Sequence, residues 1–303
     1  MKTSILAMVS VLMFQGAAWA APLRVVTTTE DLAAIAREVG GPSVQAESLA
    51  KGSQDPHFLE ARPSLILKAA RADLFVQAGM ELEAGWVGPL LVSARNPAIQ
   101  PGMPGYLDAS QAITPLEVPS GPIDRSEGDV HPSGNPHYWL DPENGKLVAS
   151  ALADRFERLL PEQAAQIETQ REDFVKRLDA AIARWKQSMA PYKGAKVVTY
   201  HRSWSYFARA FGLDVAGYME PKPGIPPSPA HLNQLILLMK QQRIGLIIME
   251  PYFSRSAPEL LVRETGAQLL VLPPSVGAEG VRTYLELFET LVDQLTTALG
   301  KGA

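Results

Sequence analysis

Two histidines lie six residues apart in a segment that is rich in proline. Residues 129–142 read DVHPSGNPHYWLDP, and they hold His131 and His137, two of the chain's five histidines. Three prolines and a glycine restrict this stretch, so it predicts a loop that fixes the direction of its side chains. Imidazole is the side chain that most often binds metals. Metal binding is therefore the first chemistry that the sequence indicates.

The order acid or amide, proline, histidine occurs twice, as DPH at 55–57 and as NPH at 135–137. Asp and Asn suit the N-cap of a helix and proline suits its first position, so His57 and His137 are each predicted in the first turn of a helix. The positive end of a helix disfavours a protonated imidazole. The neutral ring is the form that binds metal.

Two further candidates end predicted strands. His201 closes VVTYH, and Glu250 closes LIIME directly before Pro251. In doubly wound sheets, ligands bind outside the carboxyl ends of the strands, so both side chains are expected in such a crevice. His57, His137, His201 and Glu250 together predict a site for a divalent first-row metal between two halves of the chain. Glu250 also has a simpler explanation as a helix-capping acid.

Other residues near these motifs are expected to serve the structure. His231, in PSPAHLNQL, is interpreted as a first-turn helical residue. Packing is expected of the aromatic residues close to the site, which are Tyr138, Trp139, Trp204 and Tyr206.

The elements that must position these residues alternate along the chain. Alternating β-rich and helical segments predict parallel sheets flanked by helices. The expected strands are 23–29, 72–79, 195–201, 244–250 and 268–274, and the expected helices are 30–40, 203–213, 232–242 and 282–299.

A single long helix is predicted in the middle of the chain, from Pro161 to Pro191. Its apolar residues recur at helical spacing: Ile167, Phe174, Leu178, Ile182, Trp185 and Met189. About 29 residues at 1.5 Å each make a rod on the order of 43 Å long, which is more than one domain needs. We therefore predict an α/β protein with two parallel-sheet lobes, 21–158 and 193–303, joined by one rigid backbone helix, 159–192.

The N-terminus and the composition limit the class of protein. Residues 1–20 contain Lys2, an apolar run and Ala18-Trp19-Ala20, which predict a secretory signal cleaved near Ala20. The chain has no cysteine, so disulfides and thiolate zinc sites are excluded. A net charge of -4 and the absence of a basic stripe argue against a nucleic-acid partner.

The chain resembles the periplasmic solute-binding proteins of zinc and manganese ABC importers, the cluster of zinc-uptake and adhesin-type proteins. The resemblance covers nearly the whole chain after the signal and rests on DPHFLEARPS, GNPHYWLDP, YHRSWSYFARAFGL, EPKPGIPPSPAHL and IIMEPYFS. It implies a metal held between two lobes by imidazoles from both. It also implies a periplasmic protein that is not an enzyme and that delivers Zn(II) to a membrane permease with a separate ATPase. A monomer is expected.

The sequence departs from the family at the fourth ligand. Members often carry an aspartate in a turn near the C-terminus, whereas this chain has LPPSVGAEG with Ser275 there. Glu250 is the predicted fourth ligand, and water is the alternative. His131, in the approach to His137, is expected to be auxiliary. Three imidazoles favour zinc over manganese. A manganese-binding importer protein and an exported zinc-dependent hydrolase remain the other interpretations.

Overall fold

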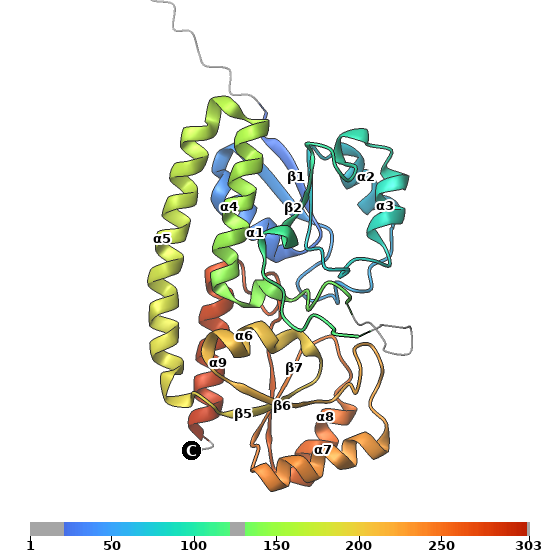
Figure 1. The fold of residues 1–303 in the computed structure, drawn as a ribbon, viewed down its shortest axis with the longest axis vertical. Helices are drawn as coiled ribbons and strands as arrows, with labels where there is room; N and C mark the ends of the chain where they lie inside the picture. Colours follow the sequence, from blue (N-terminus) through green and yellow to red (C-terminus); the bar gives the residue numbers. More distant parts are fainter. Residues whose placement is uncertain (1–20, 122–130, 302–303) are drawn as a thin grey trace, which may run out of the picture.

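The computed structural model describes residues 21–121 and 131–301 and contains two four-stranded parallel sheets (Figure 1). The predicted signal segment, 1–20, lies outside the described residues. The first sheet has the order β2-β1-β3-β4 and consists of β1 (Leu23–Thr27), β2 (Val44–Ser48), β3 (Leu74–Gln77) and β4 (Tyr106–Asp108). The second has the order β6-β5-β7-β8 and consists of β5 (Lys196–Thr199), β6 (Asp214–Tyr218), β7 (Leu246–Met249) and β8 (Gln268–Val271).

Both sheets follow the same path. The second strand pairs on one side of the first, and the third strand pairs on its other side. The strand order therefore reverses between β1 and β3 in the first sheet and between β5 and β7 in the second. Such a switch point is where ligands bind in open α/β sheets. The flanking helices are α1 (Glu30–Gly40), α2 (Pro63–Arg71), α3 (Val87–Ala94), α4 (Pro142–Leu159), α6 (Ser205–Phe211), α7 (Pro229–Gln242), α8 (Ser256–Thr265) and α9 (Tyr284–Lys301).

The predicted long helix is confirmed as α5 (Ala164–Met189), which a short 3₁₀ turn precedes. Its 26 residues correspond to about 39 Å of rod. All six residues of the predicted apolar stripe are buried. Figure 1 shows α5 running beside both lobes, with α4 and α9 along it.

One hydrophobic core joins the two lobes along this helix. Trp185 of α5 stacks on Phe288 of α9 with ring centroids 5.2 Å apart, and Phe288 also lies against Phe207 of α6. The same core includes Ile35 of α1 and Ile248 of β7, one from each lobe. The lobe boundaries at 158 and 192 stay a prediction, since the core does not divide there.

The sequence predicted part of this arrangement. The five expected strands and the expected helices all occur, with bounds that differ by a few residues. Strands β2, β4 and β6 and helices α2, α3, α4 and α8 were not predicted. None of the helices in the described ranges 21–121 and 131–301 is long and apolar enough to cross a bilayer.

The shared core predicts that metal binding moves the lobes little. A closing hinge would have to bend α5 or separate it from α9, which would expose buried aromatic surface. Small-angle scattering of the metal-free and the zinc-loaded protein should give radii of gyration that differ by less than about 1 Å. A compaction of several ångströms on zinc binding would contradict this rigid frame.

Candidate metal site

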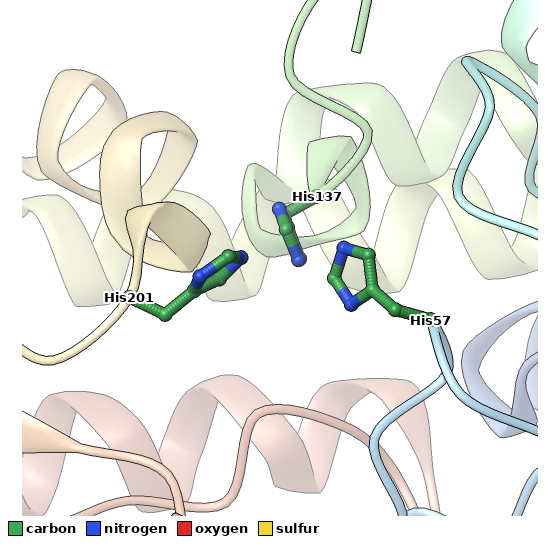
Figure 2. Close-up of side chains that lie close together, drawn as sticks. All are labelled: His57, His137 and His201. Carbon is green, nitrogen blue, oxygen red and sulfur yellow. The ribbon is translucent and has the colours of Figure 1, made fainter. Parts of the chain in front are cut away.

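Three of the predicted ligands come together between the lobes. His57, His137 and His201 each offer a ring nitrogen, and these atoms all lie within 4.8 Å of one another. The ring centroids are 5.2 to 5.3 Å apart. Figure 2 shows the rings converging from three separate segments of the chain. The Nε2 atoms of His57 and His137 are buried and have no hydrogen-bond partner among residues 21–121 and 131–301, so the lone pairs there are available to a metal.

His57 is not in a helix, which corrects the prediction from the DPH motif. It lies in a turn, and the next helix, α2, begins only at Pro63. The Asp55 carboxylate accepts hydrogen bonds from the backbone N of His57 at 3.0 Å and from its Nδ1 at 2.7 Å. Trp86 Nε1 fixes the turn by donating to the carbonyl of Pro56 at 2.9 Å. Asp55 therefore orients the imidazole instead of capping a helix.

His137 also lies outside a helix, which corrects the prediction from the NPH motif. The motif builds the same turn as at His57, and the 3₁₀ helix Tyr138–Leu140 begins directly after His137. Asn135 Oδ1 accepts from the backbone N of His137 at 3.0 Å and lies 2.9 Å from its Nδ1. Asn135 Nδ2 donates to Glu117 and to the carbonyl of Arg202, so the amide orientation is fixed. Nδ1 of His137 must then be the donor, which leaves the lone pair on Nε2.

His201 is oriented by a residue that the sequence did not identify. Its Nδ1 lies 2.6 Å from Glu220 Oε2, and the backbone N of Gly224 donates to the same carboxylate oxygen at 3.2 Å. Glu220 follows β6, which pairs with β5, the strand before His201. Glu220 could have been placed beside His201 only if Asp214–Tyr218 had been predicted as a strand next to β5. A carboxylate behind a ligating imidazole raises its basicity and fixes its tautomer.

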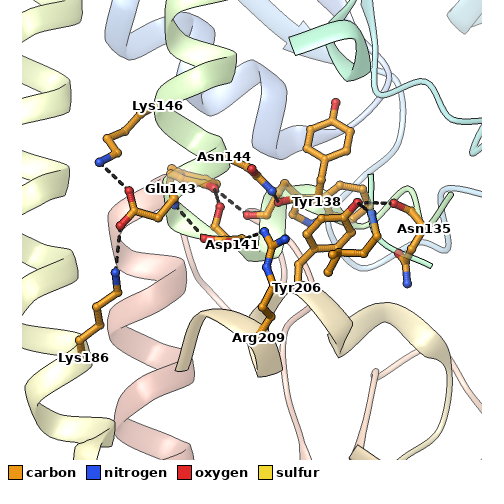
Figure 3. A network of polar contacts seen from close by, with 12 residues as sticks. Asn135, Tyr138, Asp141, Glu143, Asn144, Lys146, Lys186, Tyr206 and Arg209 are labelled. Atoms are coloured by element: carbon orange, nitrogen blue, oxygen red, sulfur yellow. Dashed lines mark hydrogen bonds and ion pairs between the residues drawn. The ribbon is translucent and has the colours of Figure 1, made fainter. Parts of the chain in front are cut away.

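A polar network anchors the His137 segment to both lobes (Figure 3). Tyr206 of α6 donates to the carbonyl of Asn135 at 2.9 Å, and Arg209 of α6 pairs with Asp141 at 2.9 Å. Asp141 also caps α4 by accepting from the backbone N of Glu143. The network therefore restrains His137 from moving independently of α6.

The local environment shifts the pKa values of two rings in opposite directions. Burial lowers the pKa of His137 well below its usual value of 6.5, and the neighbouring rings of His57 and His201 lower it further. Burial also lowers the pKa of His201, but the hydrogen bond to Glu220 and the charge of Glu250 outweigh burial and raise it above 6.5. His201 is therefore the ring at which a proton competes with metal near neutral pH.

Glu250 is not part of the group of ligand atoms that lie within 4.8 Å of one another. It follows β7, as predicted, and is completely buried beside the hydroxyl of Ser203. Burial raises the pKa of Glu250, while the nearby His201 opposes this shift. Its assignment as the fourth ligand stays a prediction.

The C-terminal turn is engaged elsewhere. The hydroxyl of Ser275 donates to Asp31 at the start of α1, and the backbone N of Val276 donates to the same carboxylate at 3.0 Å. Trp139 Nε1 donates to the carbonyl of Pro274 at 2.9 Å. Ser275 therefore ties this turn to the first lobe.

The remaining histidines differ from each other. His231 lies in the first turn of α7 and bonds the carbonyl of Tyr218 through Nε2, so its structural interpretation is confirmed. The His131 ring lies 5.3 Å from that of His57. Both His131 and His201 line a cavity of about 300 Å³ that also borders His137.

The prediction that the aromatic residues near the site serve packing is consistent with their burial. The four buried residues are Tyr138, Trp139, Trp204 and Tyr206.

Residues 25–298 match the family model for ZnuA, the periplasmic component A of the zinc-uptake complex, and the chain belongs to this family. The chain is 31% identical over 168 residues to the high-affinity zinc uptake system protein ZnuA of Brucella suis, and the match covers 54% of this chain and 50% of that protein. The match thus spans about half the length of this relative.

Two further similarities cover more of the chain. The manganese ABC transporter substrate-binding lipoprotein PsaA of Streptococcus anginosus is 23% identical over 92% of this chain and 90% of its own length. A crystal structure of ZnuA superposes with a TM-score of 0.78 at 25% identity and covers 91% of this chain and 99% of that one. This chain is therefore similar in sequence to a substrate-binding protein of a metal ABC transporter and shares its fold with ZnuA.

Zinc affinity should decrease as the pH falls, because a proton on His201 must leave before the metal binds. The raised pKa of His201 places the start of this loss above pH 6.5, and below its pKa the affinity should fall by about tenfold per pH unit. Calorimetric titration at about pH 7.5 and about pH 5.5 measures the difference. Equal affinities at the two pH values would exclude a site made of histidines.

Proposed function

We propose that this chain captures Zn(II) between its lobes and delivers it to a membrane permease that a separate ATPase powers. The single observation that carries the proposal is the convergence of His57, His137 and His201. The Nε2 atoms of the first two are buried and find no hydrogen-bond partner in the part of the chain that the structure describes. A buried polar atom without a partner costs about 1–3 kcal/mol, so the arrangement is understandable if a metal is its partner. Membership of the zinc-uptake family supports the same function.

Zinc is the preferred metal because the donors are nitrogen. Imidazole suits Zn(II), and the affinity order of first-row metals places zinc well above manganese at such a site. The manganese lipoprotein among the relatives makes a manganese importer protein the alternative. Manganese would need more oxygen donors than the three imidazoles offer.

Glu250 completes the proposed site through its charge. Its carboxylate lies close enough to His201 to affect the pKa of that ring, and its burial leaves it without solvent screening. An arriving dication would favour the ionised carboxylate and would be stabilised by it in return. Glu250 therefore belongs to the proposed metal site with the three histidines.

A zinc-dependent hydrolase is the competing class. It would need a carboxylate beside the metal that can act as a general base on a bound water. Asp55 and Glu220 are occupied by the Nδ1 atoms of His57 and His201, and Glu250, the remaining carboxylate, is completely buried. We propose that the chain is not an enzyme, and assays of ester, peptide and phosphate hydrolysis on the zinc-loaded protein test this.

We also propose that the protein is an exported monomer without a nucleic-acid partner. Its signal would be removed near Ala20.

The mature chain should bind one Zn(II) tightly. Alanine in place of His57, His137 or His201 removes one nitrogen donor and should weaken binding by at least about tenfold, and by more than that where the site loses its shape. Calorimetry against a competing chelator measures stoichiometry and affinity, and elemental analysis of protein from its own periplasm identifies the metal. Parent-like affinity in all three variants would exclude the site.

Glu250→Gln keeps the shape of the side chain and removes its charge. Zinc affinity should fall by about tenfold or more, because the dication loses a buried carboxylate beside His201. Glu259→Gln, on the exposed face of α8, is the matched control and should bind like the parent. If Glu250→Gln also binds like the parent, while the three histidine variants fail, Glu250 has no part in the site.

A further inference from the structure

His131 lies against the three-histidine group in a way that its loop sequence did not predict. Its ring centroid is 5.3 Å from that of His57, the same distance that separates His57 from His201. Its Nε2 is buried and has no hydrogen-bond partner within the described parts of the chain, as is the case for His57 and His137. His231 shows the ordinary arrangement for a structural histidine, because its Nε2 bonds a backbone carbonyl. His131 therefore shares the features of the proposed ligands.

The protein holds His131 in this position. Its ring donates a hydrogen bond to the backbone of Glu81, and because Nε2 is unpartnered the donor must be Nδ1. The carboxylate of Glu81 accepts from Ser133 through its backbone N at 3.1 Å and its hydroxyl at 2.7 Å. Gly134 N donates to the carbonyl of His131 at 3.1 Å and closes the turn. The loop after β3 thus fixes both the tautomer and the direction of the ring.

The imidazole is also in the right chemical state. The neutral ring presents a lone pair at Nε2, because Nδ1 carries the proton. Its place in the wall of the 300 Å³ cavity, which His137 and His201 also line, gives it a path toward those two rings.

We propose that His131 is the fourth ligand of the metal, so that four imidazoles bind Zn(II) and Glu250 contributes charge from beside His201. This inference rests on the proposed function. Four nitrogens at about 2.0–2.1 Å from zinc in a tetrahedron lie about 3.4 Å apart. The nitrogens of His57, His137 and His201 already lie within 4.8 Å of one another, and His131, which is outside that group of three, must move toward them to complete the tetrahedron. An all-nitrogen donor set disfavours manganese.

The test compares the zinc affinity of three variants by calorimetry with a competing chelator. His131→Ala should weaken Zn(II) binding by at least about tenfold. His231→Ala, the matched control, removes a half-buried imidazole that bonds Tyr218 and should bind like the parent. His57→Ala reports on the proposed site itself and should lose binding.

A direct ligand is distinguished from a positioning residue by two further measurements. Co(II)-loaded His131→Ala should show a changed visible absorption spectrum, because one nitrogen in its coordination shell has been replaced. Free imidazole added to His131→Gly should restore part of the affinity, since the cavity at this position is open to a small ring.

The outcomes separate the inference from the function. If His131→Ala matches the parent in affinity and spectrum while His57→Ala fails, His131 is not a ligand and the three-histidine site stands. If affinity falls but the Co(II) spectrum is unchanged and imidazole does not rescue, His131 only positions its neighbours, which overturns the inference. If His57→Ala also binds like the parent, the proposed function is itself wrong.

Discussion

The site depends on a constraint that its three central imidazoles share: the Nδ1 atom of each ring is hydrogen-bonded to a side chain in a fixed position. Asp55, Asn135 and Glu220 hold these atoms at 2.6 to 2.9 Å. This bond determines the tautomer and the direction of each ring, and it leaves Nε2 to face its counterparts. Bringing such nitrogens together in a buried place without partners is unfavourable. The surrounding fold must therefore be stiff enough to prevent the rings from turning toward other donors.

The two lobes use the same sheet topology for different purposes. In the second lobe, His201 and Glu250 follow the adjacent strands β5 and β7 at the switch point, so a regular feature of the sheet presents them to the ligand. In the first lobe, the buried carboxylate of Glu83 occupies the equivalent place by accepting from the backbone of Ala78 and Gly79. Ligands of the first lobe must therefore come from loops, and the turns around His57 and His137 provide them.

Much of this was predictable because it is local in sequence. The 3.6-residue period identified α5 and its buried stripe, and the ends of β5 and β7 placed His201 and Glu250. The DPH and NPH motifs were assigned to the wrong local geometry, because a helix cap and an Asx turn use the same bond from a side-chain oxygen to a backbone N–H. Only the additional contact to Nδ1 distinguishes them, and a sequence does not show it. The position of Glu220 depends on the pairing of β6 with β5. The position of His131 depends on Glu81, which is distant along the chain.

The rigidity of the frame determines which parts can release a metal. α5 and α9 carry one core through both lobes, and Tyr206 and Arg209 bind the His137 segment to the second lobe. Separating the lobes would break these contacts together, whereas the turn of His57 is held mainly by Asp55 and by the single bond from Trp86. Local motion of a few hydrogen bonds costs less than exposing an aromatic core. Release is therefore expected to begin in the loops of the first lobe, while His137 and His201 keep their places relative to each other.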